Sequence, residues 1–227
     1  MATGDRPTTA PGWELFPQMH ALIDAADPRF TLVATVQEAA DVMTWLEALT
    51  TTSLWNMQRH STVEALRDEA GLGARARAKG VEMRFVLPRR VADHRSPLAS
   101  SHFPYLRIAP VAHPLMISDG ARVLLGDSSG DTIWTSEDPQ VVARAVAFYE
   151  RLWASAVPAV PEGQPPPFTP RMVAIGIRLV EGATDREIAR DLGVSERTVS
   201  SDVREMSKRL GARSRAHAIA LISGVYG

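Results

Sequence analysis

Residues 184–210, TDREIARDLGVSERTVSSDVREMSKRL, constrain the fold more than any other stretch, because they encode two short helices joined by a tight turn. Thr184 and Glu187 have the spacing of a capping box, in which each side chain bonds a backbone amide at the start of a helix. Gly193 can adopt the left-handed conformation that ends the first helix, and Ser195 can cap the second. The pattern predicts a helix-turn-helix, a motif that lays its second helix on DNA.

The second predicted helix has an apolar side and a cationic side. At 3.6 residues per turn, the apolar side carries Val199, Val203, Met206 and Leu210. The opposite side, which we call the outward strip, carries Arg197, Ser201, Arg204 and Lys208. Asp202 falls on a flank, and Glu205 borders the strip. A charged helix face is usually just solvated, but after a helix and a tight turn it predicts contact with DNA.

The longer segment 168–222 resembles the C-terminal four-helix domain of LuxR/FixJ-type (GerE-like) regulators. The matching marks are Thr169-Pro170-Arg171, Gly182, Glu187-Ile188-Ala189, Leu192-Gly193-Val194-Ser195, Arg197-Thr198-Val199, Arg209-Leu210-Gly211 and Arg213-Ser214-Arg215. The resemblance covers about a quarter of the chain. It implies that Ser195 to Leu210 is the recognition helix and that a helix from about Ser214 to Ser223 supplies a dimer contact.

The resemblance also assigns roles by position. Ser200, Ser201 and Arg204 would face base edges, and Ser195, Arg197, Thr198 and Lys208 would hold phosphate. The sequence departs from the family at Met172 and Ala174, where glutamates are usual. It departs again at Ser200 and Asp202, where a basic residue and a histidine are common. These departures bear on base preference and not on the fold.

The predicted partners follow from the motif. One recognition helix contacts only a few base pairs of double-stranded DNA, so two copies should act together as a homodimer. The dimer surfaces we expect are the larger N-terminal domain and one face of the terminal helix, with Ala216, Ile219, Ala220 and Ser223. A transcription regulator also has RNA polymerase as a candidate partner, and its N-terminal domain is expected to sense an unknown effector or to mediate assembly.

Charge is divided unevenly along the chain. Residues 168–227 contain 10 basic and 7 acidic residues. The rest of the chain contains 15 basic and 19 acidic residues. The basic excess coincides with the helix-turn-helix, and we expect the acidic N-terminal part to stand away from DNA. The chain has no cysteine, no apolar run of about 18 residues and no signal-peptide pattern. A cytoplasmic protein without membrane contact is the expectation.

A proline-rich stretch marks the domain boundary. Residues 157–167, VPAVPEGQPPP, contain five prolines and predict an extended, semi-rigid spacer. The expected organisation is a domain at 1–156, a linker at 157–167 and a DNA-binding domain at 168–227.

The first 156 residues alternate helical and strand patterns, which predicts an α/β domain with a mixed sheet, followed by a small all-α domain. Helices are expected at 13–26, 36–50, 62–79 (broken near 71–73) and 137–156, the last capped near Asp138. Strands are expected at 53–58, 81–87, 105–108, 114–118, 121–125 and 132–135, with Asp119-Gly120 as a hairpin turn. In the strand at 81–87, Val81, Met83, Phe85 and Leu87 should point inward, with Glu82 and Arg84 outward.

Residues 77–88 and 113–120, within a match over 28–156, resemble the phospholipase-D-like domain of a set of actinobacterial LuxR-type regulators. The 23 arginines against two lysines also suit a GC-rich genome. Catalysis in that fold needs His-x-Lys with an aspartate downstream. Here Leu115 stands at the lysine position after His113, Gly120 stands at the aspartate position, and Asp119 is one residue out of register. We therefore expect no enzyme activity, and His113 should be a structural or pocket residue.

The remaining groups of candidate residues are weaker indications of a binding site. The six histidines show no metal-binding spacing, and no cofactor is expected. Asp127, Ser129 and Asp131 alternate like calcium ligands, but flanking glycines favour a hairpin loop. Trp45, Trp55, Trp134 and Trp153 could line a ligand pocket, although core positions are more common for such residues.

Three alternative functions stay open at this point. One is a phosphorylated receiver, which lacks the lysine it would need between Lys79 and Lys208. Another is a sensor of acyl-homoserine lactones or another small molecule. The third, from a different class, is a phosphodiesterase with a DNA-binding tail, which Leu115 argues against.

Overall fold

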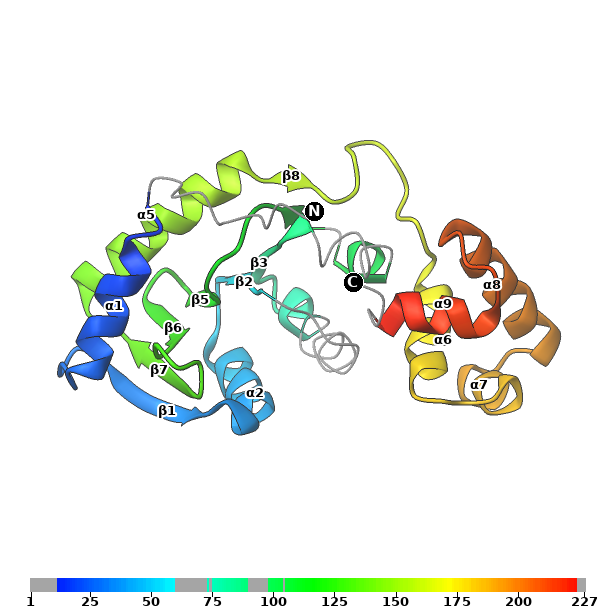
Figure 1. Cartoon of the computed structure of the whole chain (residues 1–227), viewed down its shortest axis with the longest axis horizontal. Helices are drawn as coiled ribbons and strands as arrows, with labels where there is room; N and C mark the ends of the chain where they lie inside the picture. The colour runs from blue at the N-terminus through cyan, green and yellow to red at the C-terminus, as the bar shows by residue number, and fades with distance from the viewer. Residues whose placement is uncertain (1–11, 60–72, 74, 90–97, 104, 224–227) are drawn as a thin grey trace, which may run out of the picture.

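Eight strands from the first 158 residues form one mixed sheet, and four helices follow it (Figure 1). The computed structural model describes residues 12–59, 73, 75–89, 98–103 and 105–223. The strands are β1 (Thr31–Thr35), β2 (Ser53–Met57), β3 (Glu82–Leu87), β4 (Leu106–Ile108), β5 (Leu115–Ser118), β6 (Arg122–Gly126), β7 (Thr132–Ser136) and β8 (Val157–Pro158). The N-terminal part carries α1 (Leu15–Asp24), the 3-10 helix η1 (Val36–Glu38), α2 (Ala39–Leu49) and α5 (Pro139–Ser155). The predicted α/β architecture with a mixed sheet is confirmed.

The sheet has the order β1-β7-β6-β5-β2-β3-β4-β8. Strands β2, β3 and β4 run parallel, and the other pairs are antiparallel. The predicted hairpin between β5 and β6 is present, with Asp119 and Gly120 at φ values of 55° and 61°. Asp119 also accepts hydrogen bonds from the backbone N–H groups of Thr51, Thr52 and Ser53, so the hairpin fixes the start of β2.

Helices cover both faces of the sheet. One face lies under α1 and α5 and holds a core with Phe16, Met57, Ile117 and Tyr149. The other lies under α2, with Leu46 and Leu54 in its core. The hydroxyl of Tyr149 donates to the carbonyl oxygens of Asn56, at 2.9 Å, and Arg84, at 3.2 Å, which fixes α5 across β2 and β3. Burial of the Tyr149 hydroxyl raises its pKa, so it stays a donor.

The expectation of a strand buried on one side at 81–87 is correct for Glu82, which is exposed, and for Phe85 and Leu87, which are buried, but it is wrong at Val86. β3 lies between β2 and β4, and Val86, on the side expected to be solvent-exposed, is fully buried. Arg84 on that same side lies under α5, with its guanidinium 4.2 Å from the ring centre of Trp55 and 5.5 Å from that of Trp153. Arginine can cover a sheet face because its stem is apolar and its planar head stacks on rings.

The C-terminal part contains α6 (Pro170–Val180), α7 (Asp185–Leu192), α8 (Glu196–Arg209) and α9 (Arg215–Ser223). Thr184 and Glu187 form the predicted capping box, and Gly193 ends α7 at a φ of 65°. The hydroxyl of Ser195 accepts a 3.1 Å bond from the backbone N–H of Thr198 at the start of α8. The apolar side of α8 is the core stripe that its periodicity predicted, with Val199, Val203 and Met206 buried and Leu210 half-buried.

Several elements were not anticipated from the sequence. They are β1, β8 and a helical turn at 98–102. β8 comes from the proline-rich stretch and pairs with β4 at the sheet edge, the position where a strand proline is tolerated. The predicted helix at 62–79 lies mostly outside the described residues, apart from its helical end at 75–78.

The sheet and the C-terminal helices share one apolar cluster. It runs from Phe85 and Phe103 through Leu98 to Phe168 and Ile175. The backbone N–H of Phe168 also donates a 2.8 Å bond to the hydroxyl of Ser101. The turn at 98–102 lies between the sheet and the C-terminal helices (Figure 1). Phe168, directly after the linker, therefore packs against this turn.

Candidate nucleic-acid interface

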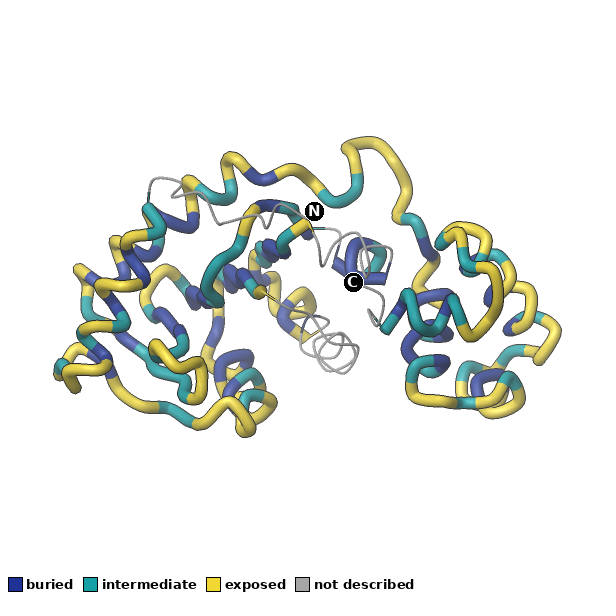
Figure 2. The backbone as a smooth tube through the Cα atoms, in the orientation of Figure 1, coloured by how far each residue is buried: buried dark blue, intermediate teal, exposed yellow. Residues whose placement is uncertain are grey.

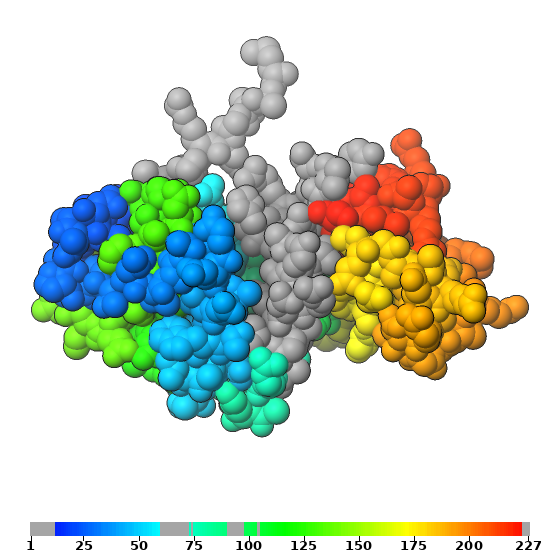
Figure 3. Space-filling model, turned by 90° about the horizontal axis from the view of Figure 1, so that it is seen from below, coloured from blue at the N-terminus to red at the C-terminus, as the bar shows by residue number. Residues whose placement is uncertain are grey.

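The outward strip is exposed along the whole of α8. Arg197, Ser201, Arg204 and Lys208 are all exposed. Helices α7 and α8 lie on the side of the C-terminal lobe that faces away from the sheet (Figures 1 and 3). The outer surface of that lobe is largely exposed, whereas its buried residues gather toward the centre (Figure 2). The surface is therefore free of contact with the acidic N-terminal part.

Most acidic residues of the C-terminal part are engaged within it. Six of the seven make an ion pair or a capping bond there: Glu181, Asp185, Glu187, Asp191, Asp202 and Glu205. The ion pairs use five arginines: Arg171, Arg178, Arg190, Arg209 and Arg215. Among the described residues, Arg197, Arg204 and Lys208 have no acidic partner within 4 Å. Internal pairing thus leaves the cations of the outward strip unneutralised.

The two acidic residues nearest the strip are held by arginines. Asp202 is buried and accepts a 2.6 Å bond from Nε of Arg171 on α6, which confirms its predicted position on the flank. Glu205 accepts a 2.7 Å bond from Nε of Arg209, and this bond lowers the pKa of Glu205. Both carboxylates are therefore paired with arginines outside the strip, which reduces their negative charge beside it.

Ser200, one of the predicted base contacts, is tied to the neighbouring helix. Its hydroxyl donates a 2.7 Å bond to Asp185, which also pairs with Arg215 of α9. Although burial raises the pKa of Asp185, the bonds from Ser200 and Arg215 lower it overall, so the group stays ionised. The sequence did not suggest this three-helix contact, because its members are 15 residues apart or more.

The remaining predicted phosphate contacts lie at the start of α8. Ser195 and Thr198 have their hydroxyls 2.8 Å apart, and Ser195 caps the helix. Ser195 is exposed and Thr198 is half-buried. Both therefore reach the N-terminal end of α8, where free backbone amides and the helix dipole favour a phosphate.

The predicted dimer face of α9 is only partly covered by its own chain. Ala216 is exposed, and Ile219, Ala220 and Ser223 are half-buried. Ile219 packs against the shared apolar cluster, and the Ser223 hydroxyl donates to the Ile219 carbonyl.

The N-terminal candidates occupy structural positions. The ring of His113 stacks on Phe16 at 4.8 Å, and burial lowers its pKa. Leu115 is buried in the core beneath α5, and Asp119 caps β2. Lys79, the sole lysine of the N-terminal part, lies 2.7 Å from Glu47. A histidine, lysine and aspartate arranged for phosphoryl transfer is not found in the described part of the chain.

The other candidate residues lie in the hydrophobic core or in a hairpin loop. Trp55 is buried, Trp134 and Trp153 pack against the same core, and Trp45 is 38% exposed. Asp127 accepts bonds from the backbone N–H groups of Gly130 and Asp131, as a hairpin loop requires. Within the described ranges, no three histidine or carboxylate side chains are grouped to hold a metal ion. No helix there is both long and apolar enough to cross a membrane.

Comparison with protein families identifies the C-terminal part. Residues 166–222 match the family of bacterial regulatory proteins called the luxR family, or GerE. The match covers α6 to α9 and includes every predicted DNA-contact residue. Residues 166–222 therefore form a LuxR-type helix-turn-helix, as the sequence resemblance predicted.

Comparisons over the whole chain are weaker. One similar solved structure is that of TrmBL2, which is described as an archaeal chromatin protein with a novel mode of DNA binding. The sequence identity is 14% and the TM-score is 0.44, over 62% of this chain and 58% of that chain. NucT from Helicobacter pylori gives 12% identity and a TM-score of 0.41, over 57% of this chain and 98% of that chain. These scores carry no argument about function. No curated protein gives a significant match.

Proposed function

We propose that this protein is a sequence-specific, DNA-binding transcription regulator that acts on double-stranded DNA through α8. The observation that carries the proposal is the outward strip, where Arg197, Arg204 and Lys208 are exposed and unpaired while neighbouring carboxylates are neutralised. An ordered row of unpaired cations on a helix-turn-helix suits phosphates and base edges. The cytoplasm as location and RNA polymerase as a protein partner belong to the same proposal.

The roles within the strip follow from position. Arg204 and Ser201 lie mid-helix on the exposed side and would read base edges, together with Ser200 if its bond to Asp185 exchanges for a base. Ser195, Arg197, Thr198 and Lys208 would hold phosphates on either side. A long arginine can bond two acceptors of guanine at once, which a serine hydroxyl cannot do. Arg204 should therefore carry the largest share of sequence discrimination.

The test compares two arginines of the same helix. A preferred duplex is first selected from a random library with the full chain, and binding is then measured on it and on a scrambled duplex. Arg204→Ala should weaken binding to the selected duplex by about 1–3 kcal/mol and change binding to the scrambled one much less. The matched control is Arg209→Ala combined with Glu205→Ala, which removes an internally paired arginine of the same helix without leaving its carboxylate unpaired. Equal losses on both duplexes for Arg204→Ala would refute the base-reading role.

The regulator should act as a homodimer, with α9 completing the interface on DNA. Ala216, Ile219, Ala220 and Ser223 bury little area between them, which suits an interface that needs DNA or a second surface to stabilise it. Sedimentation of the full chain with and without the selected duplex measures the assembly. Ala220→Arg should abolish the 2:1 complex with DNA while leaving the fold intact. An unchanged 2:1 complex in this variant would place the dimer contact elsewhere.

The N-terminal part is proposed to sense a signal or mediate assembly and not to catalyse. Its phospholipase-D-like resemblance stays a prediction, and the burial of Leu115 and the pairing of Lys79 with Glu47 leave His113 without a lysine for phosphate. The check is hydrolysis of bis(p-nitrophenyl) phosphate by the full chain. Turnover that disappears in His113→Ala would overturn the non-enzymatic assignment.

A further inference from the structure

The N-terminal part contains a pocket between α2, the sheet and the residues that precede β4. It encloses about 510 Å³, including the open space at its mouth. Its lining comes from α2 and the residue after it, from β2 and β3, and from described residues before β3 and before β4: Met43, Glu47, Thr50, Leu54, Asn56, Gly73, Ala76, Met83, Arg84, Phe85, Phe103 and Tyr105. Most of these lining residues are apolar or aromatic.

The walls of the pocket are apolar and adaptable. Phe85 and Phe103 meet edge to face, with ring centres 5.1 Å apart, and Tyr105 lies next to Phe103. Met43 and Met83 add flexible thioether side chains, which fit irregular partners and favour contact with aromatic rings. The lining therefore suits a small, mostly apolar body such as a single ring.

The charged side chains of the lining are already neutralised. Glu47 lies 2.7 Å from Nζ of Lys79 and 3.2 Å from Nε of Arg75. The guanidinium of Arg84 lies over Trp55 on the opposite face of the sheet, where it bonds Glu82. A charged ligand would lose its hydration and find no unpaired counter-charge among the lining residues, so the lining favours a neutral molecule.

The side-chain amide of Asn56 has bonding capacity left. The carboxamide oxygen of Asn56 accepts a 2.9 Å bond from Nε2 of Gln58, which assigns the amide orientation. The amide nitrogen of Asn56 then has no acceptor among the described residues, although the residue is only 8% exposed. The hydroxyl of Thr50, by contrast, is held by the Leu46 carbonyl and Ser118. The unused donor calls for a ligand with a hydrogen-bond acceptor.

We propose that this pocket binds a small neutral molecule with one ring-sized apolar body and one hydrogen-bond acceptor, such as a ketone or an ester. The acceptor lies on the amide nitrogen of Asn56, and the apolar body packs among Met43, Met83, Phe85 and Phe103. Molecules of this class are therefore the ligands that we expect the N-terminal part to bind.

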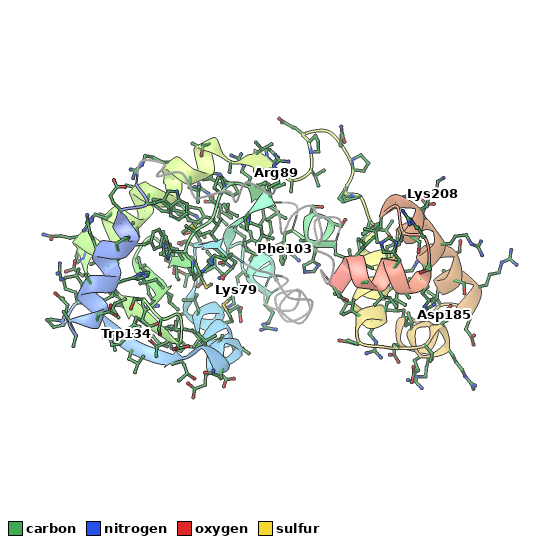
Figure 4. All side chains as sticks on the ribbon, in the orientation of Figure 1. Lys79, Arg89, Phe103, Trp134, Asp185 and Lys208 are labelled. Atoms are coloured by element: carbon green, nitrogen blue, oxygen red, sulfur yellow. The ribbon has the colours of Figure 1, made fainter. Side chains whose placement is uncertain are left out.

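The pocket is connected to the DNA-binding part through its aromatic wall. Phe85 and Phe103 belong to the apolar cluster that continues through Leu98 into α6. Phe103 lies on the side of the sheet toward the C-terminal helices (Figure 4). Leu98 fills the space left by the missing side chain of Gly176: a Cβ atom there would lie 2.9 Å from Cδ2 of Leu98 and 3.0 Å from Cε of Met206 on α8. A ligand that moves Phe103 shifts the turn at 98–102 against α6 and α8, and so changes affinity for DNA. This second step rests on the proposed function.

The ligand site is tested with three probes of similar size and the full chain. Acetophenone has the ring and the acceptor, ethylbenzene lacks the acceptor, and benzoate carries a charge. Ligand-observed NMR should detect acetophenone binding at least fivefold tighter than either of the others, the factor expected for one hydrogen bond. Asn56→Ala should remove the advantage over ethylbenzene. If that variant misfolds, Ala76→Leu, which fills the pocket, should abolish binding of both neutral probes. Equal binding of benzoate, or no binding of acetophenone, would overturn the proposal.

The connection to DNA is tested separately. Affinity for the selected duplex is measured in the full chain with and without saturating acetophenone, and a change of at least threefold is expected. Leu98→Ala should keep probe binding and lose this change, and Ser101→Ala provides a milder variant if the first unfolds. Duplex binding without any probe reports on the proposed function alone. Probe binding with unaltered duplex affinity would retain the ligand site and refute its coupling.

Discussion

The arginines of the sheet and the arginines of α8 have opposite surroundings. In the sheet, Arg84 and Arg107 lie over the ring of Trp153, at 5.5 and 4.4 Å from its centre, and Arg122 lies 5.2 Å from that of Trp45. On α8, Arg197 and Arg204 are exposed and have no ring or carboxylate partner among the described residues. The same side chain stabilises the fold in one region and is left available in the other.

This contrast separates structural charges from functional ones. A guanidinium that stacks on a ring and bonds a carboxylate contributes to folding, and its removal affects stability. A row of like charges without partners contributes nothing favourable to folding, and in the proposed function these charges bind an external anion. Four substitutions test this division, from the largest expected effect to the smallest.

Arg171→Ala should have the largest effect on stability. It leaves the buried Asp202 without its partner, and we expect the free energy of unfolding to fall by about 2–3 kcal/mol in urea titrations. The double variant Arg171→Ala with Asp202→Ala should recover part of the loss, because no buried charge is then left unpaired. A double variant less stable than the single one would contradict this account.

Arg84→Ala should reduce the free energy of unfolding by about 1–2 kcal/mol, since it removes the stacking over Trp55 and the bond to Glu82. Binding to DNA should be unchanged. The matched control is Arg29→Ala, which breaks an exposed pair with Asp27 and should cost less than about 0.5 kcal/mol. Equal effects of the two substitutions would show that ring stacking adds nothing.

Asp119→Asn should lower stability by about 1 kcal/mol at pH 7, because an amide cannot accept all the bonds from Thr51, Thr52 and Ser53. Although burial raises the pKa of Asp119, these bonds lower it well below the ordinary value of 3.8. A carboxyl group whose pKa is lower in the folded protein than in the unfolded one stabilises the fold at pH values above its unfolded pKa. This stabilisation is lost as the pH falls through its folded pKa. The difference between wild type and variant should therefore shrink below pH 3.8. A constant difference down to pH 2 would refute the assignment.

Arg197→Ala should have the smallest effect on folding, within about 0.5 kcal/mol, because no partner is lost. Its effect should be seen in the salt dependence of DNA binding. The slope of log K against log salt concentration should fall by about 0.9, the value for one phosphate contact. An unchanged slope would remove Arg197 from the phosphate-binding set.

Short-range signals made the C-terminal part predictable. The Thr184–Glu187 box, Gly193 and Ser195 act within four residues, and the faces of α8 follow from helical periodicity. In the N-terminal part, hairpin and capping signals such as Asp119-Gly120 and Asp138 were equally reliable. The interior position of β3 was not predictable, because Arg84 is a polar residue in sequence and becomes a core residue only when Trp55 and α5 pack over it.

The sequence by itself determined the helix-turn-helix, its capped ends and the cationic side of α8, because these depend on residues close together in the chain. Only the tertiary structure decided how the carboxylates beside these cations are held, since Asp202 is buried against Arg171, which lies 31 residues away in the sequence. It likewise decided that Leu98 meets Gly176 and that Phe85 and Phe103 line a pocket. Packing between segments far apart in sequence depends on the whole chain being folded, and this is why the fold had to be known before the surface and the pocket could be assigned.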